Sequence, residues 1–303
     1  MAGEGVKVHT AIGLYRNPGF WFVAPAFITV SLLLLFPIIA SVFFSFTSKH
    51  LIRPSYEFVG IQNYREVLTD PEFYHSLLVS IKWTVFSITG QLLIGFTAAL
   101  ALNRVKRMQG FFRTALIIPW AFPSIVIAFA WKWILNEVYG FLPNILMQMG
   151  ITDHPVQFLT NPNLVFLTMV GVNIWFGAPL FMVNILSALQ TIPKEQYEAA
   201  QIDGAKPWQS FIAITFHHVR IVIGLLMVLR TIWVFNNFEI VYLITGGGPA
   251  DLTKTLPIYA YRVGWGLKQL GRASAVTMVL LLFLLLVSSA YFLLLDKWEK
   301  EDV

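Results

Sequence analysis

Six long apolar segments, separated by short polar stretches, dominate the pattern of residues along the chain. They run from about 20 to 46, 77 to 102, 112 to 135, 163 to 189, 219 to 245 and 273 to 295. A helix needs about 20 apolar residues to cross the hydrocarbon core of a bilayer, and each segment is long enough. The pattern therefore predicts an all-α membrane protein with six transmembrane helices, forming a single transmembrane domain over residues 1–303.

A compact polar segment, residues 193–205, separates the fourth apolar segment from the fifth. Pro193 suits the first position of a helix, because the missing N–H needs no partner there. A short helix over 194–202 is therefore expected. Gly204 suits the left-handed residue that ends a helix, and Pro207 suits the start of the next one. The acidic residues that this helix would expose are Glu195, Glu198 and Asp203.

The composition agrees with a membrane protein and excludes several other classes. Hydrophobic residues make up 57% of the chain and charged residues 12%, whereas soluble domains average roughly 45–50% and about 25%. The mean hydropathy is +0.68. The net charge of +5 does not indicate a nucleic-acid partner, because basic loops beside membrane spans give the same balance. The chain has no cysteine, so disulfides, thiolate metal sites and cysteine nucleophiles are excluded.

Basic residues predict the orientation of the six spans. Eleven lysines and arginines fall on the side that carries residues 1–19, against seven on the other side. The side richer in basic residues faces the cytoplasm, so both termini and the segment 193–205 are predicted to be cytoplasmic. The first apolar run is too long for the core of a signal peptide and is interpreted as a retained span.

The sequence offers no constellation of catalytic residues and no metal site. No stretch has the form G-x-x-x-x-G-K-[ST], so the chain itself is not expected to bind ATP. No H-E-x-x-H is present, and the six histidines are scattered near the ends of spans. The glycine run from Gly246 to Pro249 is interpreted as a break in the backbone where a span leaves the membrane. The chain is therefore not predicted to be an enzyme.

The polar segment carries a recognisable pattern. Glu198-Ala199-Ala200 is followed by Asp203-Gly204-Ala205 and then by Trp208, Phe211 and Ile214. This run resembles the EAA loop of ABC importer permeases, which docks into a cleft of a cytoplasmic ATPase subunit and transmits its closure. The family usually has Leu-Pro after the Ile-Thr pair, whereas this chain has Phe216-His217. The resemblance implies coupling roles for Glu195, Glu198, Ala199, Ala200, Asp203 and Gly204.

Other motifs narrow the resemblance to one subfamily. They are Thr245-Gly246-Gly247-Gly248-Pro249, Thr253, Leu256 to Tyr261, Val59-Gly60, Asn63-Tyr64 and Ile118-Pro119-Trp120. Together these resemble the carbohydrate-importer permeases that include the maltose and glycerol-3-phosphate systems. The resemblance implies the fold of a type I ABC importer permease in the inner membrane of a prokaryotic cell. It also implies a sugar substrate, expected to be an oligosaccharide.

Four kinds of partner follow from the resemblance, besides the lipid bilayer and the sugar. They are a second homologous permease subunit, two copies of a cytoplasmic ATPase, an extracytoplasmic sugar-binding protein, and the ATP and Mg²⁺ bound on the ATPases. The alternative function is an ion-driven secondary transporter of a polar solute. Such a transporter would be expected to contain internal repeats and ion sites, and it would not need the Glu198–Gly204 pattern.

Polar and aromatic residues at membrane depth are candidates for the substrate pathway, since such polar groups usually face a cavity or a partner. The candidates are Asn173, Phe176, Gly177 and Leu180 in the fourth span and Arg230, Trp233 and Asn237 in the fifth. The last three are spaced i, i+3 and i+7 and are predicted to share a helix face. By resemblance, Val234 replaces an amide and Leu180 an aromatic of the maltose-type site, which implies a ligand other than maltose.

Each candidate also has a structural interpretation. Asn173 and Asn237 can form hydrogen bonds between helices, and the Trp233 ring can pack against neighbouring side chains. Arg230 can pair with Glu239 or with a neighbouring helix, although a separation of nine residues puts these two on different faces of one helix. An arginine that faces the pathway would instead favour anionic sugars such as uronates, by bidentate pairing with a carboxylate.

Overall fold

A computed structural model of the chain describes residues 18–105 and 107–300, and the regular elements within them are helices. In chain order they are α1 (Pro18–Val30), α2 (Phe36–Ser45), α3 (Gln62–Thr69), α4 (Pro71–Arg104), α5 (Gln109–Ala121), α6 (Ser124–Ile134), α7 (Phe141–Gln148), α8 (Val165–Gln190), α9 (Lys194–Ile202), α10 (Pro207–Ser210), α11 (His217–Phe235), α12 (Glu239–Thr245), α13 (Leu256–Tyr261) and α14 (Leu270–Lys300). Three π-helical segments join neighbouring helices: η2 (Ser31–Leu35), η3 (Phe211–Phe216) and η4 (Arg262–Gly266). Most of the predicted N-terminal stretch, residues 1–17, lies outside the described residues.

The chain divides into two compact units. The first unit contains the described residues up to Val67 together with Val263–Met278, and the second contains Leu68–Arg262 with the described residues from Val279 onward. Both candidate sites, the polar segment and the substrate pathway, belong to the second unit. The single transmembrane domain expected from the sequence stays a prediction.

Among residues 18–105 and 107–300, five helices are long and apolar enough to cross a membrane, and a bent pair makes a sixth candidate. The five are Trp21–Ser45, Pro71–Arg104, Val165–Gln190, Pro207–Phe235 and Leu270–Lys297, and the pair is Gln109–Ala121 with Ser124–Ile134. The pair is bent by 91° within the segment that the sequence predicts as one span. Phe122 is extended, with φ −87° and ψ 146°, because a residue before a proline, here Pro123, is pushed out of the helical region.

In the first unit, the Asn63-Tyr64 pair has a structural role. The side-chain amide of Asn63 donates hydrogen bonds of 2.9 and 2.8 Å to the carbonyl oxygens of Ser45 and Thr47. The hydroxyl groups of Tyr64 and Ser45 lie 2.7 Å apart. The last carbonyls of a helix have no partner within it, so Asn63 and Tyr64 satisfy polar groups where α2 ends.

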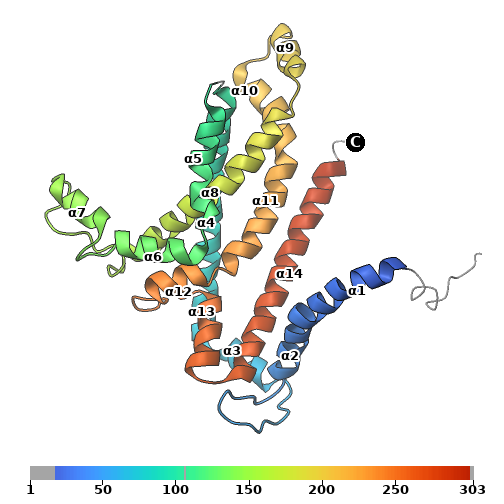
Figure 1. Cartoon of the computed structure of the whole chain (residues 1–303), viewed down its shortest axis with the longest axis vertical. Helices are drawn as coiled ribbons and strands as arrows, with labels where there is room; N and C mark the ends of the chain where they lie inside the picture. The colour runs from blue at the N-terminus through green and yellow to red at the C-terminus, as the bar shows by residue number, and fades with distance from the viewer. Residues whose placement is uncertain (1–17, 106, 301–303) are drawn as a thin grey trace, which may run out of the picture. The chain divides into compact units, whose positions relative to one another are not determined.

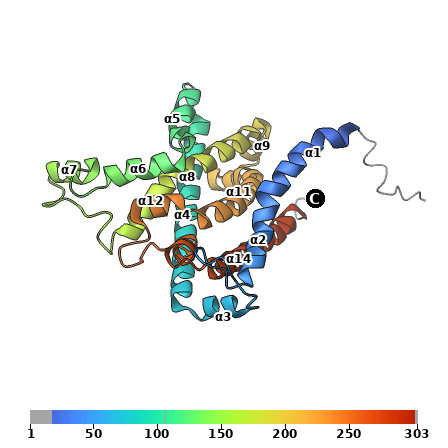
Figure 2. The same ribbon diagram turned by 60° about the horizontal axis from the view of Figure 1, so that its bottom comes forward.

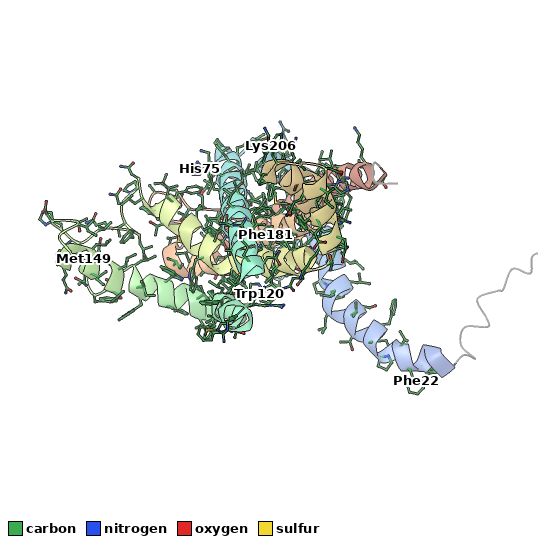
Figure 3. All side chains as sticks on the ribbon, turned by 90° about the horizontal axis from the view of Figure 1, so that it is seen from above. Phe22, His75, Trp120, Met149, Phe181 and Lys206 are labelled. Carbon is green, nitrogen blue, oxygen red and sulfur yellow. The ribbon has the colours of Figure 1, made fainter. Side chains whose placement is uncertain are left out.

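The second unit is built around α4, α8 and α11, which lie alongside one another (Figure 1). Gly95 on α4 lets the two backbones approach, because a Cβ there would meet Phe181 and the backbone of α8. Small residues serve this purpose in membrane helix pairs. Phe181 is fully buried among the helices (Figure 3). The indole N–H of Trp83 on α4 donates a 3.0 Å hydrogen bond to the Val234 carbonyl of α11.

The fifth span differs from its prediction at both ends. The helix begins at Pro207, as the sequence predicts for the start of a helix, and continues through η3 into α11, but it stops at Phe235. The predicted span 219–245 is therefore divided between two helices, α11 and α12. Asn237 explains the break, because its side-chain oxygen accepts a 3.2 Å hydrogen bond from the Ile240 N–H and so favours a new helix start at α12.

Beyond α12, the glycine run forms a loop, as predicted. Gly246 has φ +65° and Gly247 has φ +94°, values that favour glycine. Buried Lys254 pairs with Glu72 at the start of α4 and with Asp251 at 2.7 Å, and Arg262 pairs with Asp251 at 2.6 Å. Burial disfavours the charged form of Asp251, but the hydrogen bonds from Lys254 and Arg262 outweigh it and lower the pKa of this carboxyl group. These contacts fix the loop to the start of α4.

Candidate functional site

Helix α9 stands at one end of the second unit, between α8 and α10 (Figure 1). Its bounds, Lys194–Ile202, match the predicted helix. Pro193 takes the N-cap position rather than the predicted first helical position. At the other end Gly204 has φ +74°, and the N–H groups of Gly204 and Ala205 donate to the carbonyls of Gln201 and Ala200. This is a Schellman motif, which requires the left-handed glycine.

The outer surface of α9 combines charge with exposed apolar side chains. Glu195, Glu198, Ala199 and Asp203 are exposed, and Ala200 is half-buried. Beside them, Ile202 and Trp208 are 85% and 61% exposed. Exposed apolar residues rimmed by polar ones mark interaction surfaces. The exposed surface of α9 therefore combines acidic and apolar side chains.

A hydrogen bond ties α9 to the long helix that follows. The hydroxyl groups of Tyr197 on α9 and Thr215 on η3 lie 2.9 Å apart, and the Tyr197 ring packs against the hydrophobic core. Tyr197 thus links α9 directly to the segment that leads into α11. Tyr197 was not among the residues predicted from the sequence, because it is not part of the Glu198–Ala205 motif.

A cavity of about 470 Å³ lies in the second unit where α11 ends. Its lining combines four aromatic rings, a hydroxyl group, two amides, one guanidinium and one carboxylate. The residues are Trp120, Ser124, Phe176, Arg230, Trp233, Val234, Asn236, Asn237, Phe238 and Glu239. Trp120 comes from α5 (Figure 3) and Ser124 from α6, and α12 packs against α6 (Figure 2). The 91° bend between α5 and α6 therefore lies at the wall of the cavity.

Arg230 is the central polar residue of this wall. Its side chain is 4% exposed, its Nε donates a 2.9 Å hydrogen bond to Oε1 of Gln91 on α4, and its guanidinium lies 6.0 Å from the Trp233 ring centre. The Nε2 of Gln91 donates a 2.9 Å hydrogen bond to the backbone carbonyl of Asn173 on α8. Three helices are therefore joined by one chain of polar contacts.

Gly177 makes room for these contacts. A Cβ at this position of α8 would meet the Arg230 guanidinium and the Gln91 amide. Asn173 is fully buried, and neither its Nδ2 nor its Oδ1 has a hydrogen-bond partner among the described residues. Asn173 and Gly177 thus lie behind the cavity wall and support it from α8.

The comparisons with known proteins identify the family. Residues 91–300 match the model of the family described as binding-protein-dependent transport system inner membrane component. The chain belongs to this family. The recognition of an importer permease is thereby confirmed, as is the expectation that the chain is a non-catalytic subunit and a multi-pass protein of the inner membrane.

Curated relatives and solved structures agree with the family. The chain is 32% identical to the trehalose/maltose transport system permease protein MalF of Thermococcus litoralis, over 89% of this chain and 90% of the relative. It is 30% identical to the diacetylchitobiose uptake system permease protein DasB of Streptomyces coelicolor, over 94% and 88%. A bacterial ABC transporter involved in the import of the acidic polysaccharide alginate matches with a TM-score of 0.81 at 21% identity, over 94% of this chain and 97% of that chain. This last match confirms the predicted permease fold.

The structure of the permease brings four of the predicted pathway residues to one cavity: Phe176, Arg230, Trp233 and Asn237. The prediction that Asn237 shares a helix face with Arg230 and Trp233 is wrong, because Asn237 lies beyond the end of α11. Leu180 is half-buried against the core and lines no part of the cavity. The sequence left two pairing partners open for Arg230, Glu239 or a neighbouring helix. In the structure Arg230 pairs with Gln91 on the neighbouring helix α4. Glu239 instead accepts a hydrogen bond from Ser124.

Sequence reasoning missed Gln91, although a signal was present. Gln91 is the sole amide in the apolar segment 77–102, and it is fully buried. A buried amide at membrane depth usually faces a cavity or pairs with another group. Trp120, Ser124 and Phe238 were also missed, because the bend after α5 and the break after α11 bring them to the cavity.

Proposed function

We propose that this permease is one transmembrane subunit of an ATP-driven, binding-protein-dependent importer of a sugar. One feature carries the proposal. The 29-residue helix Pro207–Phe235, about 43 Å long at 1.5 Å per residue, connects the docking element α9 to the cavity. Tyr197 and Thr215 join α9 to its beginning, and Arg230 and Trp233 lie near its end.

In the proposed orientation, both termini and α9 face the cytoplasm. Glu195, Glu198, Ala199, Ala200, Asp203 and Gly204 then form the surface that docks into a cytoplasmic ATPase subunit. Two such subunits carry the ATP and Mg²⁺. A second homologous permease completes the pathway, and an extracytoplasmic binding protein delivers the sugar at the opposite face. A structurally similar bacterial alginate ABC transporter has been solved in complex with a periplasmic protein that holds an alginate pentasaccharide, which supports this last partner.

The proposed mechanism couples two sites through one element with two states. Closure of the ATPases displaces α9, and the long helix transmits this displacement to the cavity. The cavity then opens toward the binding protein and receives the sugar. After ATP hydrolysis the reverse movement opens it toward the cytoplasm. The chain supplies no chemical step, and its contribution is the rigid connection between the two sites.

The lining of the cavity supports a sugar as substrate. Flat aromatic rings such as Trp233 and Phe176 suit the faces of pyranose rings, and Asn236 and Asn237 suit their hydroxyl groups. The relatives named for trehalose/maltose transport and for diacetylchitobiose uptake support an oligosaccharide. Arg230, which pairs with no carboxylate among the described residues, favours an anionic sugar over a neutral one.

The coupling role is tested with Glu198→Ala and Gly204→Asp in the transporter reconstituted with its partners. Both variants are expected to insert normally and to lose about fivefold to hundredfold in transport, the usual range of coupling between sites. Gly150→Asp is the matched control, because Gly150 also has a positive φ of +71° and nothing within 4 Å of an added Cβ. Normal transport with normal ATPase stimulation in both variants would refute the mechanism. Transport by the purified chain alone would favour the ion-driven alternative.

A further inference from the structure

Gln91 holds Arg230 through a neutral hydrogen bond. The amide oxygen of Gln91 accepts from Nε of Arg230 at 2.9 Å, and both side chains are buried. A neutral partner fixes the orientation of the guanidinium and leaves its positive charge uncompensated. Among the described residues, no carboxylate pairs with Arg230, and its terminal nitrogens have no hydrogen-bond partner. Arg230 is one of the residues that line the cavity of about 470 Å³.

A buried, uncompensated charge is costly, so its retention calls for a partner. Glu239 lines the same cavity but accepts a hydrogen bond from Ser124 on α6 and does not pair with Arg230. The described part of the chain therefore contains no carboxylate that forms an ion pair with Arg230. A ligand that brings its own carboxylate would supply it, and the planar guanidinium pairs with carboxylates in a bidentate manner.

We propose that Gln91 is a positioning residue, which aims the Arg230 guanidinium into the cavity while leaving its charge available, so that the site takes a saccharide bearing a carboxylate group. This inference rests on the proposed sugar-import function and names the substrate class. Trp233, 6.0 Å from the guanidinium, lies beside the acidic group and packs against the sugar ring that carries it. Glu239 and Asn237 accept and donate hydrogen bonds at the remaining hydroxyl groups.

The competing role for Gln91 is purely structural, as a link between α4, α8 and α11. The two roles predict different effects on sugar binding when the charge at position 91 is changed. Gln91→Glu keeps the shape and the acceptor oxygen facing Arg230, but it introduces a negative charge that neutralises the guanidinium. A positioning role predicts a loss of preference for acidic sugars. A structural role predicts equal effects on acidic and neutral sugars.

The test measures equilibrium binding to the purified transporter complex in nanodiscs. The probes are trigalacturonate and trimannuronate, with maltotriose and mannotriose as neutral trisaccharides of equal length. The wild-type complex is expected to bind an acidic probe more tightly than its neutral counterpart. Gln91→Glu is expected to weaken acidic binding by about 10- to 100-fold, the equivalent of one hydrogen bond to a charged group, and to leave neutral binding unchanged. Arg230→Gln removes the charge directly and should give the same change in preference.

Gln148→Glu is the control, since Gln148 is exposed at the end of α7, away from the cavity lining, and the charge change is identical. Equal losses for acidic and neutral probes in Gln91→Glu, or no acidic preference in the wild type, would overturn the proposal. The binding-protein-stimulated ATPase activity of the same preparations reports on the importer function separately. Stimulated activity without acidic preference would therefore refute the substrate class and leave the proposed function standing.

Discussion

Gly177→Ala adds one methyl group at the point where α8 faces the Arg230–Gln91 pair. The new Cβ would meet the Arg230 guanidinium and the Gln91 amide, and both are ends of side chains that have to move. Their hydrogen bond of 2.9 Å is then lost, at a cost of about 1.5–3 kcal/mol for a bond to a charged group. Replacing glycine by alanine within a helix returns about 1 kcal/mol. The expected net destabilisation is about 0.5–2 kcal/mol.

Gly171→Ala on the same helix is the matched control. An added Cβ at Gly171 has nothing within 4 Å, so this variant keeps the gain in helix propensity of about 1 kcal/mol without the clash. The difference between the two variants isolates the cost at the polar pair. Denaturant unfolding of the complex in detergent measures stability, and equilibrium binding of the acidic probes measures the site. If Gly177→Ala and Gly171→Ala behave alike in both assays, Gly177 does not serve to admit the Arg230–Gln91 pair.

Two further predictions concern other contacts. Tyr197→Phe removes the 2.9 Å hydrogen bond to Thr215, worth about 1 kcal/mol. The variant should show lower sugar-stimulated ATPase activity with the same amount of membrane-inserted protein. Unchanged stimulation would refute a coupling role for the Tyr197–Thr215 hydrogen bond. The lowered pKa of Asp251 stabilises the folded loop fully above the ordinary value of 3.8, and this stabilisation is lost as the pH falls through the lowered value. Asp251→Asn should therefore lower the melting temperature at pH 7 more than at pH 3, whereas Asp153→Asn, at an exposed site, should change neither.

The sequence predicts best what depends on local pattern. Span number follows from apolar length, and the bounds of α9 follow from Pro193 and Gly204, whose backbone preferences act within a few residues. The bend after α5 was missed because a hydropathy pattern averages over Pro123, which changes the direction of the chain without changing its polarity. The break at Asn237 was missed for a similar reason, since two asparagines do not end an apolar segment.

Long-range pairing was the least predictable feature of the site. Gln91 and Arg230 lie 139 residues apart, and nothing in either local sequence specifies the other. The sequence did identify Arg230 as a residue that needs a partner. Three helices had to be positioned against each other before Gln91, rather than Glu239, emerged as that partner.

The segment η3 offers a physical explanation for His217, which stands where the family usually has a proline. Residues Phe211–Phe216 form a π-helical segment directly before His217, whose N–H donates to the Ile214 carbonyl. A π-helical turn bonds i to i+5 and changes the direction of side chains after it, and such turns recur at functional sites. It therefore provides an irregularity at the place where the family uses a proline. Thr215, the partner of Tyr197, lies inside this segment, so the irregular turn lies at the point where α9 is joined to the long helix that leads to the cavity.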